Sequence, residues 1–361
     1  MTRLITQTGQ MLVSGFPGTR LNAETEDLIV NRQIGGFILF ERNFESPAQL
    51  RALIHDMQTL ARSTPLGLPL FISVDQEGGR VSRLGPPFTR FPDPCCLGYA
   101  ASGDLARRFG LALGREMAAV GINMDYAPVL DIDTNPANPI IGKRAFARRA
   151  DEVAQLGVEF MRGFDEAGVL AVGKHFPGHG DTSQDSHLAL PRVDREADTL
   201  EREELVPFAR AIANGLKVVM TAHVIYDAWD KEFPATFSRP ILQGILRQRL
   251  GFDGLVISDD LEMKAVEDHY PFETYPALGC EAGVDLFLIC HDLDKVRRLQ
   301  DQLIRDVESG RVAKTQIETS VRRIRTVKEA IPPAPGGLAD LEALALSHRE
   351  LVREMESHLP A

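Results

Sequence analysis

The sequence predicts an α/β fold, a (β/α)8 TIM-type barrel in a single domain with a C-terminal helical extension. Eight short apolar runs typical of strands recur along the chain, and longer stretches with helical spacing of apolar residues separate them. The chain has 361 residues, of which 44% are hydrophobic and 25% charged, so it has the length and composition of an ordinary globular protein with a large core.

The expected strands are short, and eight parallel strands joined by helices favour a closed barrel. They are residues 11–16, 36–40, 70–74, 122–128, 170–175, 217–223, 254–258 and 285–290. Residues 46–62, 152–168 and 201–215 are expected helices, and the last ends at Gly215, a typical helix stop. An open doubly wound sheet is the alternative, but no GxGxxG motif follows the first strand to form a dinucleotide site.

The C-terminal part begins with a break in the pattern. The run PPAPGG at residues 332–337 is rigid and then flexible, and residues 339–359 have the spacing of one helix. We therefore expect a catalytic barrel over residues 1–331, and a linker and C-terminal helix over 332–361 that pack on the barrel or on a partner subunit. This extension is too short to be a second domain.

Charge and cysteine content narrow the class of partner. A formal net charge of -11 and a pI near 5.4 argue against nucleic-acid binding, which needs clustered Lys and Arg, and favour small or neutral substrates. The four cysteines form no CxxC pair and are expected to be reduced thiols. The N-terminus lacks a signal-peptide h-region, and no run of 18 uncharged apolar residues predicts a membrane span, so we expect a cytoplasmic protein without a membrane partner.

Polar residues follow nearly every expected strand, at the end of a barrel where catalytic groups gather, although barrel loops are polar in any case. After residues 254–258 come Asp259 and Asp260, of which one can face a pocket while the other caps the next segment, or both can cap a helix. Asp75 is followed by two arginines, Arg80 and Arg83. A carboxylate beside a guanidinium suits sugar hydroxyls, but it is also typical of a structural salt bridge.

Five motifs occur in an order and spacing that resemble the β-N-acetylglucosaminidases of glycoside hydrolase family 3. They are DQEGGRV at 75–81, IGKRAF at 141–146, KHFPGHG at 174–180, DSH at 185–187 and GLVISDDLEM at 254–263. The resemblance implies a retaining hydrolase that removes a terminal non-reducing β-linked N-acetylglucosamine or related N-acetylhexosamine, with peptidoglycan fragments as the natural substrate class. It implies no cofactor.

The resemblance also assigns the site residues. Asp259 would be the nucleophile that forms a covalent glycosyl-enzyme, and His187, paired with Asp185, would be the general acid/base. An imidazole can donate and accept a proton near neutral pH, and a carboxylate partner orients its ring. The residues implied to hold the sugar are Asp75, Arg83, Arg144, Lys174 and His175, whereas Asp260, His179 and Asp181 are interpreted as structural.

Three alternatives stay open. Several histidines and aspartates are compatible with a metal-dependent barrel hydrolase, although Lys174 beside His175 would put a positive charge near the cation. A histidine acid/base repels phosphate less than a carboxylate does, which leaves a β-N-acetylglucosaminide phosphorylase as a second reading. A sugar-binding barrel without catalysis is the third. For the hydrolase that the resemblance implies, we expect a small carbohydrate substrate, no metal, and a monomer or weak homo-oligomer.

Overall fold

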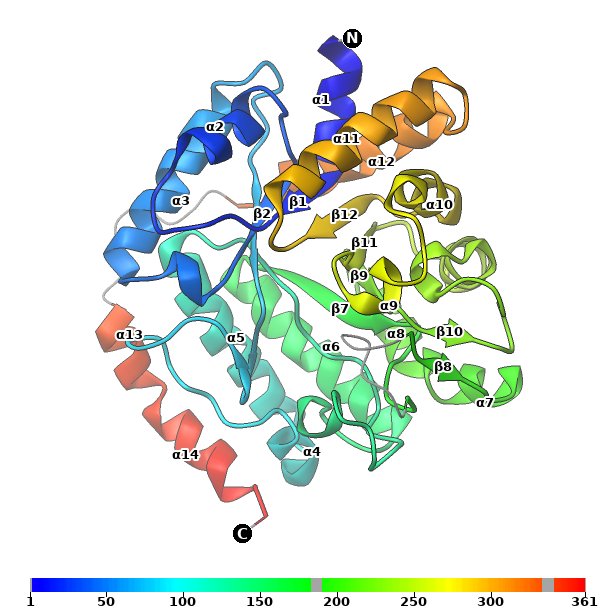
Figure 1. Ribbon diagram of the computed structural model, residues 1–361. Helices are drawn as coiled ribbons and strands as arrows, with labels where there is room; N and C mark the ends of the chain where they lie inside the picture. The colour runs from blue at the N-terminus through cyan, green and yellow to red at the C-terminus, as the bar shows by residue number, and fades with distance from the viewer. Residues whose placement is uncertain (1, 183–189, 333–340, 361) are drawn as a thin grey trace.

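Eight parallel strands close into a barrel in the computed structural model, which describes residues 2–182, 190–332 and 341–360 (Figure 1). The strands neighbour one another in chain order, and the last pairs with the first. They are β1 (Leu12–Ser14), β2 (Gly36–Leu39), β3 (Phe71–Val74), β6 (Met124–Asp125), β7 (Leu170–Phe176), β9 (Val218–Thr221), β11 (Leu255–Asp260) and β12 (Leu286–Ile289). The predicted (β/α)8 barrel is confirmed, and each expected run overlaps one barrel strand. Most strands are shorter than expected, whereas β7 and β11 extend past the predicted ends.

Helices surround the barrel, as expected for strands that are buried on both faces. The helices of the described residues that belong to the barrel region are α1 (Thr2–Gln10), α2 (Ala23–Val30), α3 (Pro47–Arg62), α4 (Cys96–Ala100), α5 (Gly103–Val120), α6 (Ala150–Ala167), α7 (Ala197–Arg202), α8 (Leu205–Ala213), α9 (Lys264–Glu267), α10 (Tyr275–Ala282), α11 (Leu293–Glu308) and α12 (Lys314–Glu329), with the π-helical η4 (Pro240–Arg249) and the short 3-10 turns η1 (Glu41–Asn43), η2 (Gly142–Arg144), η3 (Ala235–Phe237) and η5 (Phe272–Thr274). The expected helix at 46–62 is α3, with Ser46 as its N-cap and a proline in its first turn.

The single helix expected over residues 201–215 is wrong. The structure has α7, which ends at Arg202, and α8, which begins at Leu205. Pro207 explains the break, because proline lacks the N–H that a continuous helix would bond to the carbonyl of Glu203, and its ring clashes with that carbonyl. Pro207 is tolerated in the first turn of a helix that starts again at Leu205.

The C-terminal extension also forms two helices instead of one, α13 (Leu341–Ser347) and α14 (Arg349–Ser357). Both pack on the barrel helix α5, and α14 also contacts α4 (Figure 1). The hydroxyl of Ser347 donates to the carbonyl of Leu344 and so satisfies the end of α13. His348, between the two helices, is buried, and its imidazole Nδ1 lies 2.8 Å from a carboxylate oxygen of Glu116 in α5.

Two barrel strands carry a one-residue bulge near their carboxyl ends. In β7 the register against β9 shifts between Gly173 and Phe176, so that two residues of β7 stand opposite one of β9. In β11 the register against β12 shifts in the same way between Ile257 and Asp260. A bulge re-aims the side chains of the longer strand, and the residues inside these bulges include Lys174, His175 and Asp259.

Two small ribbons lie outside the barrel. An antiparallel hairpin joins β4 (Gln76–Gly78) to β5 (Val81–Ser82), and β8 (Arg192–Val193) pairs in parallel with β10 (Ile225–Tyr226). Of the helices within the described residues, none is both long enough and apolar enough to cross a bilayer.

Candidate active site

A cavity of about 560 Å³ opens at the carboxyl ends of the barrel strands. Side chains from β7, β9 and β11 line it, together with side chains at or after the ends of β2, β3, β6 and β12. Six of the residues assigned by the sequence motifs meet here: Asp75, Arg83, Arg144, Lys174, His175 and Asp259. The other two, Asp185 and His187, lie outside the described residues.

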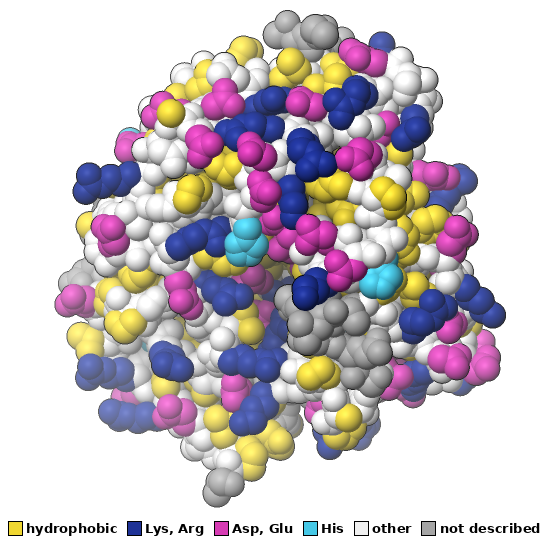
Figure 2. All heavy atoms as spheres, in the orientation of Figure 1, with side chains coloured by type: hydrophobic (Ala, Val, Ile, Leu, Met, Phe, Trp, Pro, Cys, Tyr) yellow, Lys and Arg dark blue, Asp and Glu magenta, His cyan; other side chains and the backbone are white. Residues whose placement is uncertain are grey.

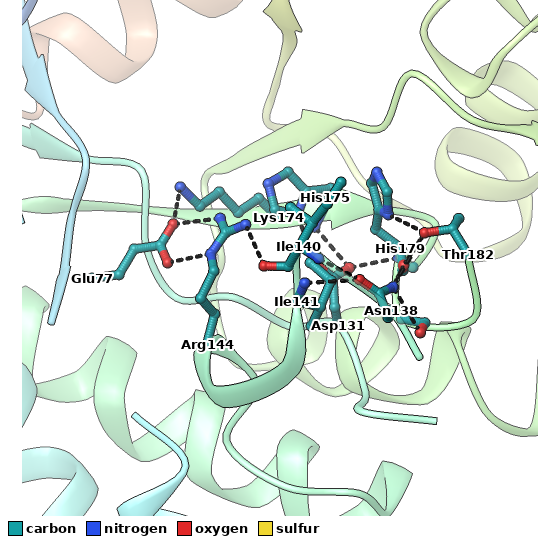
Figure 3. A network of polar contacts seen from close by, with 12 residues as sticks. Glu77, Asp131, Asn138, Ile140, Ile141, Arg144, Lys174, His175, His179 and Thr182 are labelled. Atoms are coloured by element: carbon teal, nitrogen blue, oxygen red, sulfur yellow. Dashed lines mark hydrogen bonds and ion pairs between the residues drawn. The ribbon is translucent and has the colours of Figure 1, made fainter. Parts of the chain in front are cut away.

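A buried ion network forms one wall of this cavity (Figure 3). The carboxylate of Glu77 accepts two hydrogen bonds from the guanidinium of Arg144, at 2.8 and 2.7 Å. The ammonium of Lys174 lies 2.5 Å from the same carboxylate and donates to Asp75 at 2.7 Å. Two cations and two carboxylates therefore compensate one another in a place where an unpaired charge would be costly.

The network fixes the charge of its members. Burial alone would raise the pKa of Glu77, but the charges of Arg144 and Lys174 outweigh burial and hold this pKa well below its ordinary value. Burial would lower the pKa of Lys174, but the neighbouring carboxylates of Asp75 and Glu77 raise it overall. Glu77, Arg144 and Lys174 therefore stay ionised near neutral pH, so the cavity wall presents fixed, directional donors and acceptors.

The bulge in β7 brings two consecutive side chains to the cavity. In a regular strand, Lys174 and His175 would point to opposite faces, yet both line the cavity. Their peptide bond is cis. Asp131, fully buried, holds His175 in place, because one carboxylate oxygen lies 2.6 Å from the imidazole Nδ1 and the other accepts the backbone N–H of His175 at 3.1 Å. The imidazole thus has a fixed orientation.

The turn after β7 is held by side chains from the long loop after β6 (Figure 3). The amide of Asn138 donates to the carbonyls of His179 and Gly180 at 2.9 and 3.0 Å, and the imidazole Nδ1 of His179 lies 2.9 Å from the hydroxyl of Thr182. Burial, together with the charge of His175, lowers the pKa of His179 to about 4, so this imidazole is neutral near pH 7. These contacts fit the interpretation of His179 as a residue that shapes the loop.

The end of β11 carries Asp259 and Asp260, which have different surroundings. Asp259 lies in the bulge, half-buried, and its Oδ1 accepts the backbone N–H of Asp260. Asp260 accepts the backbone N–H groups of Glu262 and Cys290, and burial raises its pKa to about 7. The alternative in which both aspartates cap a helix is wrong, because α9 begins only at Lys264, with Met263 at its N-cap.

The sequence patterns do not predict a role for Glu77 or Asp131, and they place Asp75 beside arginines. The structure pairs Asp75 with Lys174, whereas the guanidinium of Arg83 lies near the Phe40 ring and its Nε, buried, has no hydrogen-bond partner among the described residues. Glu77 stands two residues after Asp75, and residues two apart in an extended chain point to one side. That spacing is the signal that could have identified Glu77.

The described residues contain no group of three or more His, Cys, Asp and Glu side chains arranged to hold a metal ion. His223, one of the histidines considered as a ligand, is buried, with Nδ1 2.7 Å from the hydroxyl of Thr236 and Nε2 3.0 Å from the carbonyl oxygen of Asp260.

Comparison with known proteins gives consistent matches over most of the chain. The family model described as the N-terminal domain of glycosyl hydrolase family 3 matches residues 4–327. A β-hexosaminidase of Alkalilimnicola ehrlichii is 43% identical over 291 residues, which cover 79% of this chain and 82% of that protein.

Two solved structures share both the fold and much of the sequence. A glycoside hydrolase family 3 β-N-acetylglucosaminidase from Paenibacillus has a TM-score of 0.93 and 41% identity, over 98% of this chain and 68% of that chain. NagZ from Neisseria gonorrhoeae has a TM-score of 0.80 and 32% identity, over 97% of this chain and 98% of that chain.

Proposed function

The chain belongs to glycosyl hydrolase family 3 and is a hydrolase of the β-hexosaminidase type, and from this we propose that it removes terminal non-reducing β-linked N-acetylglucosamine with retention of configuration. The observation that carries the proposal is the position of Asp259. This carboxylate lies in a strand-end bulge and lines the same cavity as the ion network of Glu77, Arg144 and Lys174.

In the proposed reaction, the carboxylate of Asp259 attacks the anomeric carbon and the bond to the leaving oxygen breaks. His187, oriented by Asp185, gives a proton to that oxygen and later takes a proton from the water that releases the sugar. The assignment of His187 and Asp185 rests on the DSH motif, because both lie outside the described residues.

We propose that the sugar is held by Asp75, Arg83, Arg144, Lys174 and His175. All five line the cavity together with Asp259. The buried Nε of Arg83 has no hydrogen-bond partner among the described residues, and this supports the role, because such a donor gains most from a ligand hydroxyl or carbonyl. Glu77 keeps Arg144 and Lys174 charged and in place.

The proposed natural substrate is a peptidoglycan fragment that ends in β-linked N-acetylglucosamine, handled in the cytoplasm by a monomer or weak homo-oligomer. The four cysteines are free thiols, which is compatible with a reducing compartment. We place the catalytic barrel at residues 1–331 and treat 332–361 as an extension that supports it. Comparing a labelled anhydro-muropeptide disaccharide with chitobiose as substrates tests the substrate class.

The decisive experiment follows release of an aryl group from an aryl N-acetyl-β-glucosaminide. Asp259→Ala is expected to lose several orders of magnitude in kcat, because the nucleophile is removed. Asp253→Ala is the matched control, since Asp253 is exposed just before the other end of β11. Unchanged turnover in Asp259→Ala would refute the proposal.

The anomeric form of the first product, read by NMR, tests retention. The same assay in phosphate buffer separates hydrolysis from phosphorolysis, because a phosphorylase would release a sugar 1-phosphate.

A further inference from the structure

Residues 183–189 are flanked by two pieces of chain that the structure describes. The first, residues 176–182, is the end of β7 and the turn after it. The second, residues 190–195, contains β8. Contacts of Tyr226, Arg195 and Glu204 connect these two flanks.

Tyr226 makes the first connection. It lies in β10 and pairs in parallel with Val193 of β8, in the second flank. Its hydroxyl, fully buried, donates to the carbonyl of Gly178 in the first flank at 2.6 Å. The backbone N–H groups of its neighbours Ile225 and Asp227 donate to the carbonyls of Pro191 and Val193 in the second flank. The Tyr226 side chain therefore links the first flank to a strand that is bonded to the second.

Arg195 makes the second connection. It belongs to the second flank, and its Nε lies 3.7 Å from a carboxylate oxygen of Asp181 in the first. The same guanidinium lies 2.6 Å from Glu203 and 3.4 Å from Glu204, at the junction of α7 and α8. The guanidinium of Arg195 therefore contacts both the first flank and the junction of the two helices.

Glu204 packs against the first flank. Its side chain is 1% exposed, and one of its carboxylate oxygens, Oε2, has no hydrogen-bond partner among the described residues. Gly178 has a φ of +136°, and a Cβ built on it would lie 2.5 Å from this oxygen. The carboxyl group of Glu204 therefore packs directly on the backbone of Gly178, with no room for a side chain between them.

We propose that Tyr226, Arg195 and Glu204 are positioning residues for the proton-transfer half of the reaction, because they fix the two flanks between which His187 occurs in the chain. The inference rests on the proposed function, in which His187 is the general acid/base. It adds residues that touch neither the sugar nor the reacting atoms.

The first test compares leaving groups. Arg195→Gln and Tyr226→Phe are assayed on the phenyl and the dinitrophenyl N-acetyl-β-glucosaminides. A misplaced general acid slows the cleavage of a substrate with a poor leaving group more than that of an activated one. We therefore expect kcat/KM to fall about tenfold or more on the phenyl substrate, and at least several-fold less on the dinitrophenyl substrate.

Arg192→Gln is the matched control. Arg192 lies in the same flank and pairs with the half-buried Asp227, but it makes no contact with the first flank that the structure describes. It should change both rates less than twofold. Equal losses on the two substrates in both test variants, or no loss in either, would overturn the inference. Tyr226→Phe removes a single oxygen, so it keeps the test decisive if Arg195→Gln does not fold.

The second test uses pH. Burial raises the pKa of Glu204 to about 8, so its carboxyl group is protonated at neutral pH. The charged and titratable groups that face it are Arg195, Glu203, Asp131, Asp181 and Tyr226. Above about pH 8, ionisation puts an added negative charge against Gly178, and among the described residues Arg195 is the cation that can compensate it.

Glu204→Gln keeps the shape of the protonated form and cannot ionise. The ratio of its kcat/KM to that of the wild type should be constant below about pH 8 and rise above it. Taking the ratio cancels the titration of groups common to both proteins. A ratio that stays flat through the alkaline range would exclude Glu204 from the positioning role.

The two proposals fail in different ways. If the wild type releases no aryl group, the proposed function and the inference both fall. If the wild type is active and Asp259→Ala is not, but Arg195→Gln and Tyr226→Phe show no dependence on the leaving group, only the inference falls.

Discussion

Glu77 organises one wall of the cavity although the proposed chemistry uses none of its atoms. Glu77 is 3% exposed, and its carboxylate bonds to Arg144 in the loop after β6 and to Lys174 in β7. Without that charge, two cations would be buried close to one another with Asp75 as their main counter-charge. The residue therefore sets both the stability and the charge of the site.

Glu77→Gln is expected to lower the free energy of unfolding by about 3 kcal/mol at neutral pH, because one partner of a buried ion network loses its charge. KM should rise as well, since Arg144 and Lys174 lose their fixed positions. Urea unfolding and steady-state kinetics measure the two effects. Glu201→Gln, which alters a partly exposed pair with Arg249, should cost at most about 1 kcal/mol.

The acid dependence of stability follows from the same residue. The pKa of Glu77 is lowered by folding, so the unfolded chain takes up this proton first as the pH falls. The stabilisation is complete above the ordinary glutamate pKa of 4.5 and is lost progressively below it. The gap in stability between wild type and Glu77→Gln should therefore narrow below about pH 4.5, and a gap that stays constant would contradict this account.

At the scale of residues, the sequence predicts which side chains line the cavity better than it predicts which side chains they bond to. Asp75, Lys174 and His175 were identified from strand ends and motifs, because a barrel brings those ends together. The bond between Glu77 and Arg144 joins residues 67 positions apart. Such a contact depends on the path of the loop after β6, which no local pattern encodes.

At the scale of elements, apolar periodicity locates the barrel strands, and its failures have local physical causes. Pro207 interrupts the helix expected over residues 201–215 and separates α7 from α8. His348, which contacts Glu116, lies at the break between α13 and α14. Bulges could not be predicted, because a bulge is a relation between two strands and not a property of one. The bulges in β7 and β11 place Lys174, His175 and Asp259.

The C-terminal extension is expected to stabilise the loop that carries Arg83, one of the residues proposed to hold the sugar. Glu116, buried in α5, accepts the backbone N–H of Thr89 at 2.8 Å and contacts His348 at the same distance. Thr89 lies in the loop that also carries Arg83. His348→Ala should lower the free energy of unfolding by about 2 kcal/mol, through a buried carboxylate left with fewer donors, and should raise KM.

Thermal unfolding and steady-state kinetics check that prediction. His358→Ala is the matched control, because His358 is exposed at the end of α14. A His348→Ala protein with normal stability and normal KM would mean that the extension is not coupled to the barrel.

At the scale of the whole molecule, charge agrees with a small sugar ligand better than with a polyanion. Acidic and basic side chains lie intermixed over the face presented in Figure 2, and the net charge is -11. Nucleic-acid binding would need a continuous basic surface. The sequence predicts this property directly, because net charge requires no knowledge of contacts.

Metal removal provides a test of the mechanism as a whole. The favoured reaction uses a carboxylate and an imidazole, so excess chelator should leave kcat unchanged, and added zinc should not raise it. Elemental analysis of the purified protein accompanies the assay. Loss of activity in chelator, with recovery on adding one specific metal, would revive the metal-dependent alternative.

Because of the two bulges, the orientation of the site side chains depends on the lengths of the neighbouring strands. A bulge exists because one strand has one more residue than its neighbour over the same stretch. The neighbour is β9 for the bulge with Lys174 and His175, and β12 for the bulge with Asp259. Replacing one apolar side chain of β9 or β12 by another of similar size keeps this one-residue difference. One inserted or deleted residue would change it and turn the site side chains to the wrong face. Among relatives that keep the activity, these two strands should therefore vary in composition but never in length.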